Sequence, residues 1–366
     1  MRKQIVYIHR ADFDKRPPVI SAVYNLVDLG HNVILITTGI SPSHKKFLES
    51  QGVVIHIVSF KAKPTDNILL KTYYNIKYRR SVCKLLKRYS IVDNILWVEG
   101  NYTYVALWRS CIRKYELILQ IQELYLGRLQ ALSTKSIINK AKLIFMPEYN
   151  RAILYYFRFK LNQLPSILPN KPDFEISRAQ LLDCELKYKD FEKKVGNRKI
   201  ILYQGLICEE RDLSPFMEAF EKISTDYVFV VVGKDYGMLS RYKQINPSLI
   251  HVDYLSAPEY LFFTSKAYIG IVTYEMKSLN SVYCAPNKIY EYASFGVPMI
   301  ANDIPGLRYT VGYNKAGVVL NGLDRNAILS AVKNIEIKYR EYSDNARNMF
   351  TTVNNRETIK KTLERL

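Results

Sequence analysis

The sequence predicts an α/β protein with two domains, each built around a parallel sheet. Three observations lead to this fold class. A chain of 366 residues is long for a single hydrophobic core. Short apolar runs alternate with helix-like stretches along most of the chain, as in parallel α/β sheets. The alternation is interrupted once, by the proline-rich segment 165–174.

The apolar runs give the expected strands of two Rossmann-like halves. Each run is short and almost continuous, which is typical of strands buried on both faces. In the first half they are QIVYIH, LGHNVILITTG, GVVIHIVSF, NILWVEG, LILQIQEL and AKLIFMP, and in the second KIILYQG, YVFVVVG, LIHVDYL, AYIGIVTY and VPMIAND.

The segment PSILPNKPDF has three prolines in ten residues, and we interpret it as the hinge between the domains. We therefore predict an N-terminal domain over 1–170 and a C-terminal domain over 171–340. A last helix, at 341–366, could cross back to the N-terminal domain.

Composition limits the class of protein. Apolar residues make up 48% and charged residues 24%, as in ordinary globular proteins. No apolar run approaches the ~20 residues that span a bilayer, and the N-terminus lacks the pattern of a secretory signal. The five cysteines are scattered, without C-x-x-C pairs, so we expect neither disulfides nor structural zinc. These features predict a cytoplasmic protein.

Positive charge is concentrated in the first half of the chain. Residues 1–172 contain 27 Lys and Arg against 10 Asp and Glu, whereas residues 173–366 contain 26 against 24. Such a one-sided field favours a polyanionic partner, either the anionic surface of a membrane or nucleic acid.

The segment APNKIYEYASFGVPMIAND predicts a short helix over 287–295 that leads into a buried strand. Pro286 suits a helix start, and Gly296 followed by Pro298 marks the end. Lys288 and Glu291 then share one face close to the helix N-terminus, where free backbone N–H groups attract an anion. The pattern indicates a phosphate site, and the alternative is a solvated surface pair.

Four segments together resemble the nucleotide-sugar glycosyltransferases of the GT-B fold, closest to glycosyltransferase family 4. They are LGHNVILIT, SILPNKPD, LYQGLICEERDLSPFMEAF and NKIYEYASFGVPMIA, in the family's order. The resemblance implies two Rossmann-like domains facing each other across a cleft. It also implies a hexosyltransferase that takes a nucleotide-sugar, with UDP favoured, as its donor substrate and needs no metal or other cofactor.

By this resemblance, the C-terminal domain binds the donor. Glu291 would bind the ribose hydroxyls and Lys288, in the variant PNK form that begins at Pro286 and includes Asn287, would face the diphosphate. Gly205 and Arg211 would form the other side of the donor site. The strand and turn HVDYLS, with Tyr254, lies where relatives hold the base.

Two positions depart from the family pattern. Leu206 stands where many relatives have an arginine after the glycine, so Lys288 or Arg211 would supply that contact. Tyr283 stands where retaining relatives have the first glutamate of a pair, which leaves retention or inversion at the anomeric carbon open.

The first domain would bind the acceptor. Three acidic residues are candidates for the catalytic base: Glu123 in IQELY, Glu99 after the fourth strand and Asp12 after the first. Glu123 could instead cap a helix or lie in solvent.

Residues 71–90 predict an amphipathic helix whose apolar stripe is flanked by cations. The candidate acceptor or membrane contacts are Lys77, Arg79, Arg80, Lys84, Lys87 and Arg88. A scaffold helix with a solvated basic face, a helix on anionic lipid and a nucleic-acid groove are the alternatives, and nucleic acid is the least favoured because no nucleic-acid module is present.

The sequence therefore predicts a transferase at the inner face of the membrane that moves a sugar to a glycan or lipid-linked acceptor in bacterial surface-polysaccharide synthesis. Three alternatives remain. A GT-B epimerase of nucleotide-sugars would release product without an acceptor. A synthase of the glycogen or sucrose type is disfavoured by the missing first glutamate and by the basic first half. A non-enzymatic polyanion-binding protein would leave Glu291 and Lys288 without a role.

Overall fold

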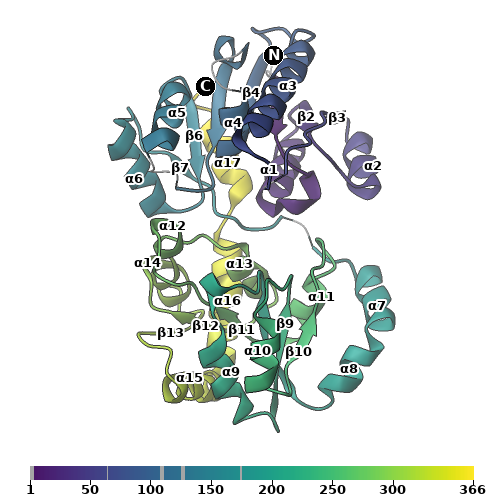
Figure 1. Ribbon diagram of the computed structural model, residues 1–366, viewed down its shortest axis with the longest axis vertical. Helices are drawn as coiled ribbons and strands as arrows, with labels where there is room; N and C mark the ends of the chain where they lie inside the picture. The colour runs from purple at the N-terminus through teal and green to yellow at the C-terminus, as the bar shows by residue number, and fades with distance from the viewer. Residues whose placement is uncertain (1–3, 64, 108–110, 125–127, 174) are drawn as a thin grey trace. The chain divides into compact units, whose positions relative to one another are not determined.

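The computed structural model describes residues 4–63, 65–107, 111–124, 128–173 and 175–366. The chain forms two compact units, coloured along the chain in Figure 1. Unit 1 comprises Met1–Asp173 and Asn354–Leu366, and unit 2 comprises Phe174–Val353. The predicted boundary after residue 170 falls just before this division, and Phe174 of the predicted hinge lies outside the described residues.

Unit 1 is built on a seven-stranded parallel sheet with the order β3-β2-β1-β4-β5-β6-β7. The strands are β1 Gln4–His9, β2 Val33–Thr37, β3 Val54–Ile57, β4 Asn94–Glu99, β5 Glu116–Gln120, β6 Leu143–Met146 and β7 Ser166–Ile167. The helices are α1 Pro17–Asp28, α2 Pro42–Ser50, α3 Ile68–Leu86, α4 Asn101–Leu107, α5 Arg128–Ile138, α6 Tyr149–Phe159 and α17 Asn355–Leu363, with the short turns η1 Phe13–Lys15 and η2 Cys111–Lys114.

Unit 2 repeats this plan with six parallel strands in the order β10-β9-β8-β11-β12-β13. The strands are β8 Lys199–Gln204, β9 Tyr227–Val232, β10 Ile250–Val252, β11 Ala267–Val272, β12 Met299–Asn302 and β13 Gly317–Leu320. The helices are α7 Arg178–Lys187, α8 Lys189–Val195, α9 Ser214–Glu221, α10 Leu239–Ile245, α11 Leu261–Ser265, α12 Leu279–Val282, α13 Asn287–Ser294, α14 Pro305–Leu307, α15 Arg325–Ile337 and α16 Tyr339–Thr352, with the turns η3 Glu209–Arg211 and η4 Arg308–Gly312.

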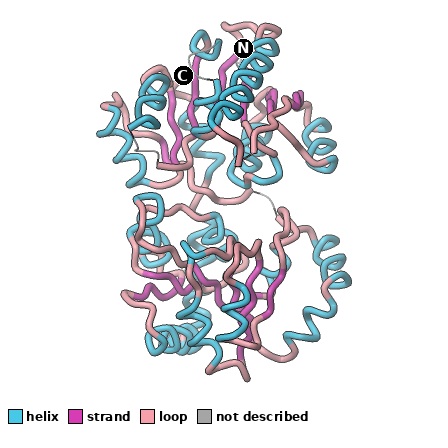
Figure 2. The backbone as a smooth tube through the Cα atoms, in the orientation of Figure 1, coloured by secondary structure: helices cyan, strands magenta, loops and turns pink. Residues whose placement is uncertain are grey.

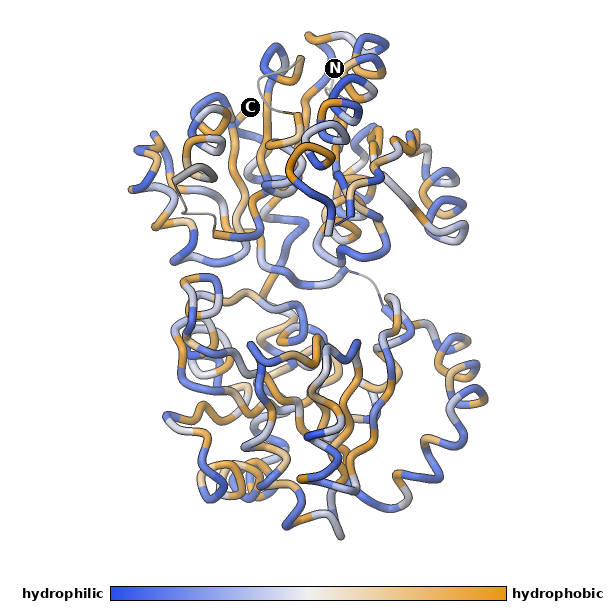
Figure 3. The backbone as a smooth tube through the Cα atoms, in the orientation of Figure 1, coloured by the Kyte–Doolittle hydropathy of each residue, from blue (hydrophilic) through white to orange (hydrophobic). Residues whose placement is uncertain are grey.

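The predicted α/β class with two Rossmann-like halves is confirmed. In each unit the strands lie between helices (Figure 2), and hydrophobic residues follow the strands (Figure 3). Strands β1, β4 and β9 are almost wholly buried, because helices cover both faces of a parallel sheet. Among the described residues, no helix combines the length and apolar character needed to cross a bilayer.

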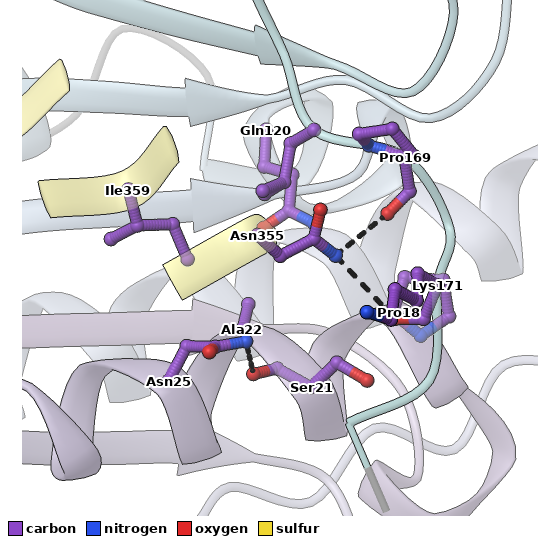
Figure 4. A pocket seen from close by; sticks show the side chains of 10 residues that line it. Pro18, Ser21, Ala22, Asn25, Gln120, Pro169, Lys171, Asn355 and Ile359 are labelled. Carbon is purple, nitrogen blue, oxygen red and sulfur yellow. Dashed lines mark hydrogen bonds between the residues drawn. The ribbon is translucent and has the colours of Figure 1, made fainter. Parts of the chain in front are cut away.

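The chain end differs from the single helix predicted over 341–366. Two helices occur instead: α16 packs on α13 in unit 2, and α17 packs on α1 and β7 in unit 1. The Asn355 side chain donates to the backbone oxygens of Pro169 at 3.0 Å and Lys171 at 3.5 Å (Figure 4). The hollow beside Asn355 is too tight to admit a water molecule, so it is part of the packing that holds α17.

One expectation about local structure needs refinement and another was wrong. The predicted hinge contains the division between the units, but it is not all linker, because Ser166–Ile167 pairs with β6 as the seventh strand. Disulfides were not expected, yet Cys83 and Cys111 are bonded. They lie 28 positions apart, but α3 packs against η2 and brings their Cα atoms to 5.9 Å, which is within the range of a disulfide.

Candidate functional site

Each sheet has a point where the chain reverses its direction of winding. It lies between β1 and β4 in unit 1 and between β8 and β11 in unit 2. Ligands of open α/β sheets bind at the carboxyl ends of the strands next to such a point. Seven of the nine residues predicted for catalysis and donor binding lie at these strand ends or on the segments and helices that come after them; Glu123 follows β5 and Tyr254 follows β10 instead.

Helix α13 of unit 2 begins as the sequence predicted. Pro286 is its N-cap and Asn287 its first residue, and Gly296 follows the helix with a φ of 67°. Lys288 and Glu291 are 6% and 5% exposed. The alternative of a solvated surface pair is therefore wrong, and both ionisable groups belong to the interior of unit 2.

Hydrogen bonds hold the Glu291 carboxylate from two directions. The Tyr260 hydroxyl donates to Oε1 at 2.7 Å, and the Gln204 side-chain amide donates to Oε2. Gln204 is itself fixed by the Thr264 hydroxyl, which donates to its Oε1 at 2.8 Å. Burial raises the pKa of Glu291, and these donors together with Lys288 oppose the rise. Each carboxylate oxygen keeps a lone pair for a further donor.

The Lys288 amine has no such partners. Its Nζ is buried and makes no hydrogen bond with any residue that the structure describes. It lies 4.0 Å from the centre of the Tyr203 ring, an arrangement typical of a cation–π contact. Burial and the neighbouring Arg211 hold the pKa of Lys288 well below its usual range. A buried ammonium without an acceptor is costly, so the arrangement favours an anionic ligand.

Gly205, at the end of β8, has no side chain between its backbone and the cationic groups of Lys288 and Arg211. Its φ is +143°, a conformation that L side chains rarely adopt. A Cβ added here would lie 3.1 Å from Lys288 Nζ and 3.4 Å from an Arg211 terminal nitrogen. Both cations therefore face the Gly205 backbone at the end of β8, and Arg211 also lies over the Tyr274 ring at 4.9 Å.

The other donor-side predictions are less constrained. Asn287 is half-buried, and Tyr254, after β10, is 54% exposed. Burial, Glu291 and Tyr254 all raise the pKa of Tyr260, which places Tyr254 near the Glu291 cluster. Leu206 offers only its backbone oxygen, which accepts from the Tyr203 hydroxyl at 3.0 Å.

In unit 1, Glu99 is buried at the end of β4 and paired with His9. Its Oε2 lies 2.6 Å from His9 Nδ1. The other two acidic candidates have other contacts. Asp12 caps η1 by accepting from the Asp14 backbone N–H at 3.2 Å. Glu123, whose side chain is 45% exposed, lies 3.5 Å from the Arg151 guanidinium.

The basic helix is α3, and most of its predicted cations face solvent. The exposed ones are Lys77, Arg80 and Lys84 on α3, together with Lys87 and Arg88 directly after its last residue. Arg79 is half-buried and its Nε donates to the Ala106 backbone oxygen at 2.8 Å. Tyr78 and Val82, from the predicted apolar stripe, are fully buried against unit 1.

Sequence reasoning missed His9, Gln204 and Tyr260. Gln204 directly precedes the glycine that was singled out, so the strand end itself was a signal. His9 is the last residue of the first predicted strand, but a lone histidine shows no partner locally. Tyr260 lies 31 positions from Glu291, a separation that no short motif covers.

Residues 198–336 match the family model described as glycosyl transferases group 1. No curated protein is similar enough to this sequence to match.

The whole chain resembles solved structures at low sequence identity. Anabaena HepE in complex with UDP-glucose has 11% identity, 100% coverage of both chains and a TM-score of 0.74. A glycosyltransferase from Rickettsia africae has 15% identity, covers 99% of this chain and 94% of its own, and gives 0.65. Sucrose-phosphate synthase from Thermosynechococcus elongatus has 14% identity, covers 98% of this chain and 95% of its own, and gives a TM-score of 0.65. These likenesses show the GT-B fold, and the family model shows that the C-terminal unit contains a glycosyltransferase domain of the group 1 type over residues 198–336.

Proposed function

We propose that this glycosyltransferase moves a hexosyl group from a UDP-sugar to a hydroxyl of a glycan or lipid-linked acceptor in surface-polysaccharide synthesis, without a metal ion. One observation carries the proposal: the buried Lys288 amine, unpartnered among the described residues, faces the open backbone at Gly205 together with Arg211. Complexes of HepE with UDP and with UDP-glucose support a uridine nucleotide.

The reaction creates negative charge on the departing diphosphate. As the bond between the anomeric carbon and the phosphate oxygen breaks, an amine protonated beside the bound diphosphate and a guanidinium stabilise that charge. Lys288 and Arg211 supply these groups, and the free backbone N–H groups at the start of α13 add to them. Glu291, fixed by Tyr260 and Gln204, accepts hydrogen bonds from the ribose hydroxyls.

Helix α3 is the part of the protein that would contact an anionic membrane surface. Ile68 and Leu69, in its first turn, are 79% and 78% exposed, and Tyr73 is 57% exposed. Exposed apolar side chains beside a basic face fit the boundary between lipid headgroups and acyl chains. The protein would then lie at the inner face of the membrane, where lipid-linked acceptors can be reached.

Donor binding tests the enzymatic part. We expect UDP and one UDP-sugar to raise the melting temperature of the wild type with increasing concentration, and GDP, ADP and CMP to leave it unchanged. Glu291→Ala should lose the shift. If none of these nucleotides shifted the melting temperature at millimolar concentration, that result would contradict the proposal. Turnover of a UDP-sugar to a new nucleotide-sugar without an acceptor would favour an epimerase.

Vesicle binding tests the membrane part. Changing four exposed cations of α3 and its C-cap to glutamine should strongly reduce co-sedimentation with anionic vesicles at low salt, since each basic residue contributes about 1 kcal/mol. The set is Lys77, Arg80, Lys84 and Lys87. A control set from unit 2 removes the same charge and should bind like the wild type: Lys189, Lys194, Lys243 and Lys333. Equal binding by both sets would exclude α3 as the contact.

A further inference from the structure

Arg10 is a cation of unit 1 whose hydrogen-bond partners are neutral. It directly follows β1, and its backbone N–H donates to the Thr103 hydroxyl oxygen at 3.0 Å. Its side chain leaves the strand ends and reaches α3, where Nη1 donates to the side-chain oxygen of Asn75. In the described part of the chain, no Asp or Glu pairs with this guanidinium. Because Asn75 is a neutral amide, the positive charge of Arg10 is left uncompensated.

Two aromatic rings flank the Arg10 guanidinium. Its central carbon lies 4.3 Å from the centre of the Phe60 ring and 5.7 Å from that of the Tyr102 ring. Such rings attract the face of the cation but accept no hydrogen bond from the N–H groups at its edge. Burial lowers the pKa of Arg10, and the Tyr78 and Tyr102 hydroxyls oppose this change. The guanidinium therefore keeps its charge in a poorly hydrated place, where a cation without an anion is costly.

Only one of the three nitrogens of the Arg10 guanidinium has an acceptor among the described residues. Nε is buried and without a hydrogen-bond partner there, whereas Nη2 has no partner and is open to solvent. Nε and Nη2 share one edge of the planar group, so their N–H bonds point the same way and can hold two oxygens of one anion. The nearby Tyr78 hydroxyl is also buried without a partner in the described residues. This excess of donors favours an oxyanion as the ligand.

The Arg10 guanidinium contacts the part of α3 that follows the exposed apolar residues of this helix. Ile68 and Asn75 are seven positions apart, so they share a face of the helix two turns, or roughly 10 Å, from each other. Lys71, which is half-buried, comes between them on that face. An interfacial helix buries its apolar side chains about 5–10 Å into the boundary between headgroups and acyl chains. With Ile68 in that boundary, phosphate groups would lie at the level of Lys71 and Arg10.

We propose that Arg10 and Lys71 bind the terminal phosphate of a membrane lipid. The proposal rests on the membrane part of the function given above, and it adds recognition of one class of headgroup to the general attraction of a basic face. A phosphomonoester carries a charge of about −1.5 to −2 near pH 7 and has three oxygens that accept hydrogen bonds. It can therefore bond to both nitrogens of the free guanidinium edge and to the lysine amine. A phosphodiester has a single charge and two free oxygens, so it fits the site less well.

Binding to vesicles of two compositions tests the site. Both contain phosphatidylcholine; one also contains phosphatidic acid, a phosphomonoester, and the other phosphatidylglycerol, a phosphodiester, in amounts that give the same surface potential. The readout is the ratio of the two affinities in a sedimentation assay. We expect the wild type to prefer phosphatidic acid about 10-fold, as for one or two hydrogen bonds between charged groups. Arg10→Gln should bind both vesicles equally.

Arg80→Gln is the matched control, because Arg80 is an exposed arginine of the same helix. Its loss should weaken binding to both vesicles alike, about fivefold, as for one basic residue near a membrane surface. The ratio should stay as in the wild type. Lys71→Gln should reduce the ratio without abolishing it. If Arg80→Gln lowered the ratio as far as Arg10→Gln, the preference would come from total charge and the proposed site would be overturned.

Asn75→Asp tests the site without removing the arginine, and it stays informative if Arg10→Gln does not fold. The substitution places a carboxylate beside Nη1 and compensates the charge of Arg10 from within the protein. We expect a higher melting temperature in the absence of lipid, because the buried guanidinium gains a charged partner. The preference for phosphatidic acid should be lost, because the new carboxylate repels the phosphate. A preference that survives in Asn75→Asp, together with a higher melting temperature, would overturn the assignment.

Inorganic phosphate distinguishes a lipid site from a site for a soluble phosphate. At constant ionic strength, and with saturating UDP to occupy the proposed donor site, excess phosphate should reduce binding to phosphatidic acid and leave binding to phosphatidylglycerol unchanged. A thermal shift with phosphate that depends on Arg10, in a protein that prefers neither vesicle, would assign the site to a soluble phosphate and overturn the lipid proposal. Equal ratios for the wild type and Arg10→Gln would overturn it as well. Failure of the wild type to bind either vesicle would instead contradict the membrane part of the proposed function.

Discussion

The first six strands of unit 1 and the six strands of unit 2 have the same order. The two units differ in the residues that they place where the chain reverses its direction of winding. At the end of β8, Gln204 is followed by a glycine whose backbone faces the side-chain nitrogens of Lys288 and Arg211. At the end of β1, His9 is followed by Arg10, whose guanidinium stacks on Phe60 at 4.3 Å. One edge leaves backbone open to a ligand, and the other fills the same position with a side chain.

This difference shows what each edge can bind. The edge of unit 2 presents N–H groups, an amine and a guanidinium, which are all donors and suit a diphosphate. The edge of unit 1 presents the His9 imidazole, paired with the Glu99 carboxylate, and the amide groups of Asn101 and Gln122, which can hydrogen-bond to hydroxyls. We therefore propose that one fold provides an anion site in one copy and a hydroxyl site in the other, through the residue after a single strand and the helix that follows.

The largest expected effect comes from removing the amine of unit 2. Lys288→Met keeps the length of the side chain, and we expect it to lower kcat/KM about 10²- to 10³-fold, because a preorganised group facing the leaving diphosphate is lost. Without ligand, the same variant should be more stable than the wild type by about 1–3 kcal/mol, since an unpaired buried polar group has been replaced by an apolar one.

The control for this variant is Lys333→Met, which removes an exposed lysine from the same unit. It should change neither quantity. Thermal unfolding with and without UDP, together with transfer kinetics, measures both effects. Lower stability of unliganded Lys288→Met, with unchanged kcat/KM, would show that the amine is structural and that the two edges do not differ as described.

Proton uptake on donor binding is a second test of the anion site proposed at the edge of unit 2. The pKa of Lys288 in the unliganded protein is held well below its usual range by burial and by Arg211. A diphosphate beside the amine favours the ammonium, so binding should take up a proton and affinity should fall as pH rises through the lowered pKa. The sign for folding is the reverse: the unfolded chain binds this proton more tightly, so unliganded stability rises with pH between the lowered folded pKa and 10.5.

Calorimetry of UDP binding in two buffers with different ionisation enthalpies measures the uptake. Work near pH 8 keeps the phosphate, with a pKa of about 6, fully ionised. The wild type should take up as much as one proton and Lys288→Met none. Equal uptake by both proteins would show that the proton goes elsewhere, and the anion site would lose its main electrostatic argument.

Helix start and stop signals made the proposed anion site of unit 2 predictable from the sequence. Pro286 and Gly296 bracket the helix, and the spacing of Lys288 and Glu291 places both on one face. The burial of this pair and the partners of Glu291 were not predictable, because Gln204 and Tyr260 reach it only through the tertiary structure. The same holds for Cys83 and Cys111, which are joined by the packing of α3 on η2.

The site of unit 1 shows the limit more clearly. Glu99 was a candidate from its place at a strand end, but His9 was not. Their positions are 90 residues apart, and only the pairing of β1 with β4 makes them neighbours. The strand β7 and the break between α16 and α17 were missed for a simpler reason: two residues show no periodicity, and the polar run before Asn355 can continue a helix as well as end one.

The smallest expected effect tests the glycine that distinguishes the two edges. Gly205→Ala adds a Cβ 3.1 Å from Lys288 Nζ at a φ of +143°. The strain should cost about 1–3 kcal/mol of stability, and the methyl group should weaken UDP binding about 10-fold by occupying the space before the amine. Gly196→Ala, with a φ of +60° and open space around it, is the control. It should lose stability but bind UDP normally in a titration. If both variants bound UDP equally well, backbone access at the end of β8 would not be what separates the anion site from the hydroxyl site.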